Sequence, residues 1–95
     1  MSNGRIFYPS FRVLHRMFAA LLEEPTSKSR LARKTNAGHS RFGHHLDWCE
    51  EKSIIELKIE RRTIVVKLTQ RGREFAEILV DDRTPTNLSR IDNNR

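Results

Sequence analysis

The chain has little of what several common classes of protein require. It carries a single cysteine, Cys49, in 95 residues, so no intrachain disulfide can form, and a reducing compartment is the simplest prediction. No uninterrupted apolar run is long enough to cross a bilayer, so we expect no membrane partner. Residues 1–9 also lack the long apolar segment of a secretory signal. We therefore expect a cytoplasmic location.

Motifs for catalysis and metal binding are equally scarce. We find no nucleophile elbow, no phosphate-cradling glycine loop and no recognisable pair of catalytic carboxylates, which predicts a protein that is not an enzyme and leaves no small-molecule substrate evident. His45 and Cys49 stand four residues apart and could offer zinc two ligands, whereas a structural site normally needs four. We expect no metal and no cofactor, and interpret Cys49 as a core residue beside partly exposed histidines.

Positive charge is what the chain has in excess. Its 18 Lys and Arg outnumber its 12 Asp and Glu, which gives a net charge of +6 and a sequence pI of about 10.2. Such a balance favours a polyanionic partner, because each phosphate contact releases condensed counterions and the field guides the approach. A chain of 95 residues makes one domain with a modest core.

The first predicted helix begins after Ser10, whose hydroxyl can cap free backbone N–H groups. It ends near Glu24, because Pro25 disfavours the α conformation in the residue before it. Ahead of it, the apolar residues 6–8 either cover an edge of the core or contact a partner subunit. Its apolar stripe, which predicts packing against other helices, comprises Phe11, Leu14, Met17, Phe18, Leu21 and Leu22.

Two further short helices are predicted on either side of a turn. The second helix starts at residue 26 or 27 and runs to about 35, with Leu31 and Ala32 facing inward. Asn36 and Gly38 suit a turn, because both tolerate the left-handed backbone conformation. The third helix starts at residue 39 or 40 and runs to about 52. Its core face comprises Phe42, Leu46 and Cys49, with His45 at the edge.

A β-hairpin follows the third helix. In the segment from Ile54 to Ile59, apolar Ile55, Leu57 and Ile59 alternate with charged residues, and Ile64, Val66 and Leu68 repeat the spacing on the return. This predicts two strands with one buried face. The tip, residues 60–63, contains two arginines and lacks the glycine that favours a tight hairpin turn, so the sequence leaves the register open.

This order of elements predicts an α+β, mostly α fold: a winged helix-turn-helix with three N-terminal helices, a two-stranded β-hairpin wing and a C-terminal helix. Thr69 is expected to cap that last helix, in which Phe75, Ala76, Ile78 and Leu79 form another apolar stripe. The stripe can extend past the core and pair with a second copy, so we expect a homodimer. We divide the chain into an arm (1–9), the domain (10–82) and a flexible polar tail (83–95).

The fold predicts which residues meet double-stranded DNA. Arg41 is the best candidate for a base or phosphate contact, since its planar fork matches guanine O6 and N7 or a phosphate, and His44 is next. Gly43 is costly inside a helix, by roughly 1 kcal/mol relative to alanine, so we expect a backbone close to it, either the second helix or DNA. The expected DNA-binding residues are Lys28, Arg30, Arg33, Lys34, Asn36, His39, Ser40, Arg41, Gly43, His44, Arg61 and Arg62.

Three stretches resemble a known family, the short archaeal winged-helix transcriptional regulators, related broadly to MarR and PadR type domains. The matching segments are S-R-L-A-R-K-T-N-A-G-H-S-R-F, H-L-D-W-C-E-E-K-S-I-I-E and L-T-Q-R-G-R-E-F, and the likeness covers about residues 10–80. The resemblance implies that the helix from His39 is the recognition helix, that the hairpin is the wing and that the protein is a dimeric regulator. Cys49 and Ser53 stand where the family commonly has Leu and Gly. Pro85 and the polar tail leave too little helix for the family's C-terminal coiled coil.

Sequence-specific DNA binding, at a nucleoid location, is therefore the expected function. The alternative is a winged helix that serves as a protein-protein interaction module in a larger assembly, since a fold does not dictate a function. For individual basic residues, an ordinary solvated face is the competing interpretation. RNA recognition lacks an aromatic stacking platform, because Trp48 and Tyr8 are isolated in the sequence.

Overall fold

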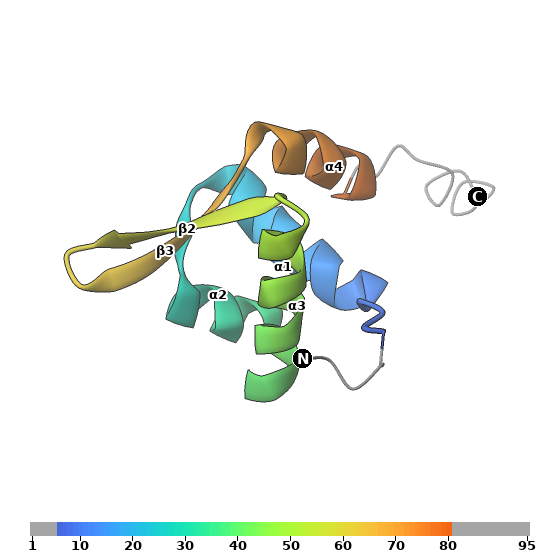
Figure 1. Cartoon of the computed structure of the whole chain (residues 1–95), viewed down its shortest axis with the longest axis horizontal. Coiled ribbons are helices and arrows are strands. Elements are labelled where there is room, and N and C mark those ends of the chain that lie inside the picture. The colour runs from blue at the N-terminus through green and yellow to red at the C-terminus, as the bar shows by residue number, and fades with distance from the viewer. Residues whose placement is uncertain (1–5, 81–95) are drawn as a thin grey trace, which may run out of the picture.

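The described part of the chain, residues 6–80 of a computed structural model, forms a winged helix (Figure 1). This confirms the predicted α+β, mostly helical class. The remaining residues, including the predicted tail from 83 to 95, lie outside the described part. In chain order the elements are α1 (Phe11–Glu23), β1 (Thr26–Ser27), α2 (Lys28–Thr35), α3 (His39–Glu51), β2 (Ile55–Glu60), β3 (Thr63–Leu68) and α4 (Gln70–Val80).

Local capping sets the starts of the first two helices. The Ser10 hydroxyl accepts a hydrogen bond from the N–H of Val13 at 3.4 Å, which confirms the predicted cap of α1. The helix ends before Glu24, whose backbone is extended ahead of Pro25, as expected. Ser27 caps α2 by accepting from the N–H of Arg30 at 3.3 Å.

The strand β1 was not predicted. Thr26 and Ser27 pair antiparallel with Val66 and Val65, so the sheet has the order β1-β3-β2. Two residues are too few to show an alternating pattern, and their partner lies about forty positions further along the chain. The pairing holds the start of α2 against the wing, whereas the sequence pattern had placed these two residues in the helix itself.

The turn between α2 and α3 adopts the backbone that its sequence predicts. Asn36 ends α2 in the left-handed conformation, with φ 54°, and Gly38 has φ 89° directly before α3. The N–H of Asn36 donates to the carbonyl of Ala32, and that of Phe42 donates to the carbonyl of Gly38. This turn sets the direction in which α3 leaves α2 and therefore fixes its exposed face.

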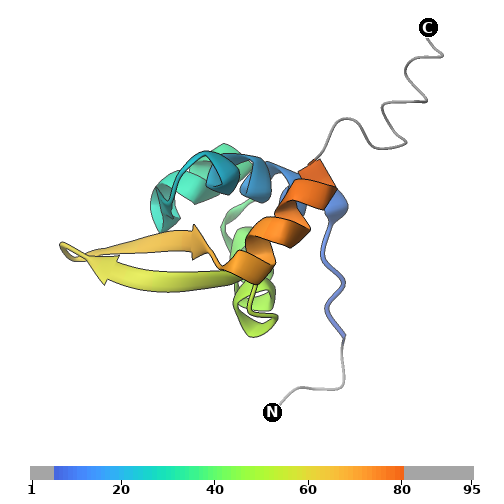
Figure 2. The ribbon, with the colours of Figure 1, turned by 90° about the horizontal axis from the view of Figure 1, so that it is seen from above.

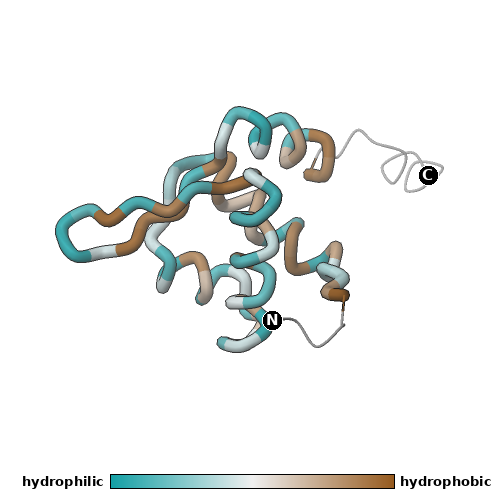
Figure 3. Tube along the Cα trace, in the orientation of Figure 1, coloured by the Kyte–Doolittle hydropathy of each residue, from teal (hydrophilic) through white to brown (hydrophobic). Residues whose placement is uncertain are grey.

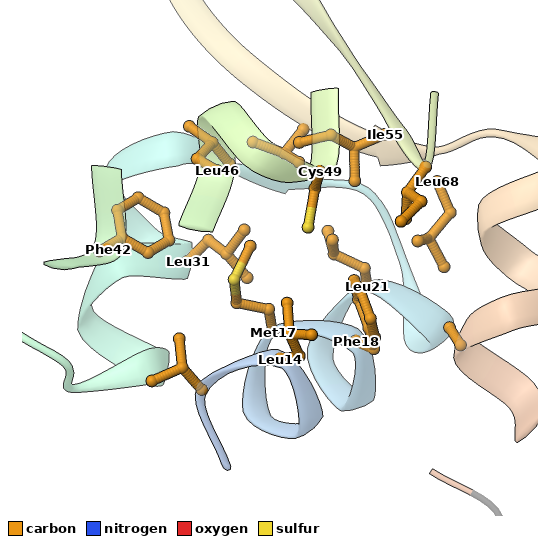
Figure 4. Close-up of a cluster of buried hydrophobic side chains, with 14 residues drawn as sticks. Leu14, Met17, Phe18, Leu21, Leu31, Phe42, Leu46, Cys49, Ile55 and Leu68 are labelled. Atoms are coloured by element: carbon orange, nitrogen blue, oxygen red, sulfur yellow. The ribbon is translucent and has the colours of Figure 1, made fainter. Parts of the chain in front are cut away.

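The core is built by α1 against α2, α3 and the base of the sheet. Figure 4 shows Met17 of α1 pointing toward Leu31 of α2, while Phe18 lies beside Leu21. The ring of Phe18 packs edge-on against that of Phe75 from α4. The prediction that Phe11 belongs to the buried stripe of α1 was wrong, since Phe11 is 61% exposed. It lies in the first turn of α1, beyond the edge of the core. The rest of the buried cluster includes Val13, Leu14, Leu21, Cys49, Ile54, Ile55, Val66, Leu68 and Ala76.

The wing projects from this body in both views (Figures 1 and 2). Its register pairs Ile55 with Leu68 at the base and Ile59 with Ile64 near the tip. Apolar residues continue along the hairpin toward its tip (Figure 3), but the expected buried face is confined to the base: Ile55 is buried, whereas Ile59 is 79% exposed. The outer half of the wing extends beyond the buried core of residues 6–80.

The start of α4 is hydrogen-bonded to the loop before β2, through Thr69 and the carbonyls of Ser53 and Ile54. Thr69 accepts from the N–H of Gly72 at 2.9 Å, which confirms the predicted cap. The apolar stripe of α4 is only partly buried, since Ala76 is inside the core while Ile78 is 71% exposed. No helix within residues 6–80 combines the length and apolar character that crossing a membrane requires.

Candidate nucleic-acid interface

The N-terminal half of α3 presents one edge to solvent. Phe42 and Leu46 are buried, whereas Ser40 and His44, four residues apart and therefore on one edge, are exposed. Arg41 and Asp47 are also exposed. The side chains that were expected to meet base edges are thus free of the core.

On one flank of α3 lies a hollow of about 590 Å³, here called the wing-side hollow. Its positively charged or titratable residues come from three elements: Lys28 from α2, His39 from α3 and Arg62 from the wing turn. Ser29, Ala32, Phe42, Thr63 and Ile64 complete the lining. The structure therefore brings one end of α2, the start of α3 and the wing tip together around one open surface.

The wing tip holds its two arginines in an unusual backbone conformation. Arg61 and Arg62 form the two-residue loop between β2 and β3, and both have positive φ, 51° and 67°. A two-residue hairpin loop with both residues left-handed normally uses Asn-Gly, because side chains beyond glycine are strained there. Both arginines are exposed. The turn therefore places two adjacent positive charges at the end of the wing.

A second hollow, of about 440 Å³, lies on the opposite flank of α3 and is here called the α1-side hollow. Three arginines line it: Arg12 and Arg16 from α1, and Arg41 from α3. The other lining residues are Ser10, Val13, Asn36 and Ala37. Sequence reasoning missed Arg12 and Arg16, although their spacing of four puts them on one face of α1, opposite its apolar stripe.

His45 joins α3 to the start of α1. The backbone N–H of Ser10 can only donate, so Nε2 of His45, at 2.8 Å, is its acceptor. The proton is then on Nδ1, which donates to the carbonyl of Arg41 at 2.8 Å. The expectation of a residue at the edge of the core was wrong, because His45 is only 2% exposed. The ring of Phe7 packs edge-on against it, at 5.0 Å between centroids, so the arm covers this edge.

This bonding leaves His45 without a free ring nitrogen for a metal. Burial also raises the pKa of the neighbouring Cys49 thiol to about 12, which disfavours the thiolate that zinc binds. Among residues 6–80, no group of three or more potential ligands is placed to hold a metal ion. The spacing of His45 and Cys49 in the sequence thus reflects two residues that both face the core.

The remaining expected residues are distributed more widely. Arg30, Arg33 and Lys34 are exposed on α2 and line neither hollow. At Gly43, the expected close approach of α2 was wrong, since a Cβ there would meet nothing within 4 Å. Of the two backbones expected near Gly43, the second helix and DNA, the open space leaves DNA.

Comparison with known proteins gives structural neighbours. No family model matches the chain, and no curated protein matches it. Among solved structures it is similar to the MarR family transcriptional regulator SPO1453 from Silicibacter pomeroyi, with a TM-score of 0.67 and 25% identity over 84% of this chain and 61% of that one. It also resembles the transcriptional regulator BldR from Sulfolobus solfataricus, with a TM-score of 0.69 and 23% identity over 96% and 69% of the two chains.

A third neighbour was solved on DNA. The transcriptional repressor CouR, bound to a 23-mer DNA duplex, has a TM-score of 0.63 and 22% identity over 79% of this chain and 58% of its own. All three of these neighbours are transcriptional regulators or repressors. The chain spans about three fifths of the length of SPO1453.

Proposed function

We propose that this protein is a sequence-specific double-stranded DNA-binding transcriptional regulator of the MarR-like winged-helix class. One observation carries the proposal. The exposed edge of α3, with Ser40 and His44, adjoins a hollow in which Lys28, His39 and Arg62 from three separate elements meet. The neighbours named above are transcription regulators, and one of them is bound to a duplex, which supports the same function here.

In this proposal α3 lies in the major groove. A helix with its side chains is about 10–12 Å wide, which matches the roughly 12 Å width of that groove. Ser40 and His44 then face base edges. Glu50 and Glu51 would repel phosphates, so the N-terminal half of α3 enters most deeply.

The wing and α2 supply contacts to the backbone. Arg61 and Arg62 reach the adjacent minor groove or its phosphates, and Lys28 meets the strand beside the wing-side hollow. Arg30, Arg33 and Lys34 on the exposed side of α2, together with Asn36 in the turn, extend the contacts along the backbone. Gly43 lets the duplex approach α3 closely, since within residues 6–80 no atom outside its own stretch of helix comes within 4 Å of where a Cβ would lie.

We further propose a homodimer in the cytoplasm, associated with the nucleoid. Its support is the set of large apolar side chains left exposed on the helical body, including Phe11 and Ile78. Two copies related by a twofold axis would read two half-sites. Sedimentation equilibrium tests the assembly, and a single species at the chain mass of 11.2 kDa would contradict it. An archaeal origin, implied by the resemblance, stays a prediction.

Selection of bound duplexes from a random pool, followed by salt titration of the selected sequence, tests the function. We expect a preferred sequence, an affinity that falls steeply with salt, and a relaxed preference in His44→Ala. Arg62→Ala should weaken binding to all sequences alike. Arg73→Ala on α4 removes the same charge away from both hollows and is the matched control. Salt-insensitive, weak binding without preference would contradict the proposal and favour a protein-interaction module.

A further inference from the structure

We propose that the α1-side hollow is a second phosphate-binding site, in which Arg12, Arg16 and Arg41 hold a backbone phosphate of the duplex. This inference rests on the proposed function and deepens it. It assigns Arg41 to the backbone and not to a base, and it adds α1 to the binding surface, where the sequence placed no DNA contact.

The position of the hollow follows from the geometry of α3. Consecutive helical residues are about 100° apart, so His39 and Arg41 leave α3 on opposite flanks with Ser40 between them on the outer edge. His39 lines the wing-side hollow and Arg41 lines the α1-side hollow. A major groove has a sugar-phosphate strand along each of its edges. With α3 in the groove, one strand passes the wing-side hollow and the other passes the α1-side hollow.

The chemistry of the α1-side hollow suits a phosphate. Three arginines from two helices line it, and their like charges repel one another until an anion joins them. Each guanidinium presents a planar fork of N–H donors that matches two phosphate oxygens. The amide of Asn36 at the rim adds a neutral donor.

The hollow is also held in shape before any ligand arrives. Arg16 donates from Nη1 to the carbonyl of Thr35 at 3.2 Å, which fixes its guanidinium across the end of α2 while other N–H groups stay available. Ser10 at the opposite rim is bonded to His45, and the same ring is bonded to the backbone of Arg41. The N-terminus of α1 and the Arg41 segment of α3 are therefore tied to one buried side chain.

A charge-neutral backbone provides the sharpest test. Methylphosphonate is placed at one position at a time on each strand of the selected duplex, and binding is compared for wild type and the double variant Arg12→Gln, Arg41→Gln. Arg16 is left in place because it also bonds Thr35. We expect one position, on the strand opposite the wing, at which wild type loses about tenfold in affinity and the double variant loses nothing further. The salt slope of the double variant should fall by about 0.9 for one lost phosphate contact.

The controls separate this inference from the function on which it rests. The double variant Arg71→Gln, Arg73→Gln changes the same charge on α4 and should leave affinity unchanged, and equal melting temperatures would show that each variant is folded. If the hollow variant binds like this control while Arg62→Ala binds weakly, the second site is wrong and the function stands. If wild type binds no duplex, both are wrong.

A free anion is the other source of the same chemistry. Inorganic phosphate is titrated into the protein, with amide NMR shifts as the readout. Shifts at the hollow together with unchanged duplex affinity of the double variant would assign the site to a free anion and overturn the proposal. The proposal is supported if inorganic phosphate weakens binding of the unmodified duplex more than binding of the duplex that carries methylphosphonate at the sensitive position.

Discussion

The two ends of the wing hairpin are built in opposite ways. At the base, where β2 begins and β3 passes into α4, hydrogen bonds and close packing satisfy the backbone. At the tip, two arginines adopt a conformation that glycine or asparagine would take more readily. The base is thus held by hydrogen bonds between its segments, whereas the tip carries two positive charges on a left-handed turn.

At the base, one hydroxyl connects three segments. Thr69 Oγ1 donates to the carbonyl of Ser53 at 2.6 Å, lies 3.2 Å from that of Ile54 and accepts from the N–H of Gly72. The N–H of Thr69 donates to the Ile54 carbonyl at 3.0 Å. The close approach of α4 to this loop depends on Gly72, where a Cβ would lie 1.8 Å from the Ile54 oxygen.

At the tip, no side-chain hydrogen bond from the described part of the chain supports the backbone in this way. The neighbouring pair Ile59 and Ile64 is exposed, and the turn residues Arg61 and Arg62 have left-handed φ values. A left-handed conformation costs an ordinary residue roughly 1–2 kcal/mol. Strain of this kind persists at functional sites, where the side chain matters more than the local stability. The comparison predicts that changes at the base alter folding and that changes at the tip alter binding.

The largest effect is expected for Gly72→Ala. The added methyl group would overlap backbone atoms of Ile54, which cannot move without breaking the bonds to Thr69. We expect the free energy of unfolding to fall by more than about 3 kcal/mol, at the upper end of the overpacking range. Urea denaturation followed by circular dichroism measures it.

Gly43→Ala is the matched control for Gly72→Ala. It also replaces a helical glycine, but in open space, so stability should rise by up to about 1 kcal/mol. Equal losses in both variants would mean that helical glycine in general, and not the contact with Ile54, sets the cost.

An intermediate effect is expected when Arg61 and Arg62 are replaced by asparagine and glycine, respectively. Both new residues suit the left-handed turn, so the free energy of unfolding should rise by about 1–2 kcal/mol while duplex affinity falls. Thermal melting and duplex titration measure the two quantities on the same sample.

Replacing both Arg61 and Arg62 with lysine tests whether charge and strain are separable at the tip. Lysine keeps the positive charge and the same steric cost, so stability should stay near that of wild type, and the charge-dependent part of the duplex affinity should remain. If the variant with asparagine and glycine gains no stability, the tip is not strained.

What the sequence predicts well is set by neighbours along the chain. The caps at Ser10 and Thr69 and the left-handed turn at Asn36 depend on residues within one helical turn, and each is found as expected. The winged-helix order of elements follows from the same local patterns and is confirmed.

What the sequence misses depends on partners far away in the chain. β1 exists only because Thr26 meets Val66, and the burial of His45 depends on Ser10, 35 residues earlier. The gathering of Arg12 with Arg41 likewise requires α1 to pack against α3. Periodicity identifies the face of a helix but not the side chains that another helix brings to it.

The smallest effect, and the most local one, is expected for Ser53→Gly at the base. The N–H of Ser53 donates to the carbonyl of Glu50 and that of Ile54 donates to the carbonyl of Cys49, which is the hydrogen-bond pattern of a Schellman helix end. The left-handed position of this motif is normally occupied by glycine, whereas here Ser53 occupies it, with φ 63°. Ser53→Gly should therefore raise the free energy of unfolding by roughly 0.5–1 kcal/mol, measured by urea denaturation.

Ser53→Ala separates backbone strain from loss of the serine hydroxyl. Alanine keeps the Cβ that makes a positive φ costly, so it should give no gain, while the bonds from Thr69 to the carbonyls of Ser53 and Ile54 persist in both variants. If the free energy of unfolding rises equally in the alanine and glycine variants, the serine hydroxyl and not the left-handed backbone lowers the stability of the wild type. In that case the base of the wing would be free of backbone strain, and the contrast with its tip would be sharper than the φ values alone indicate.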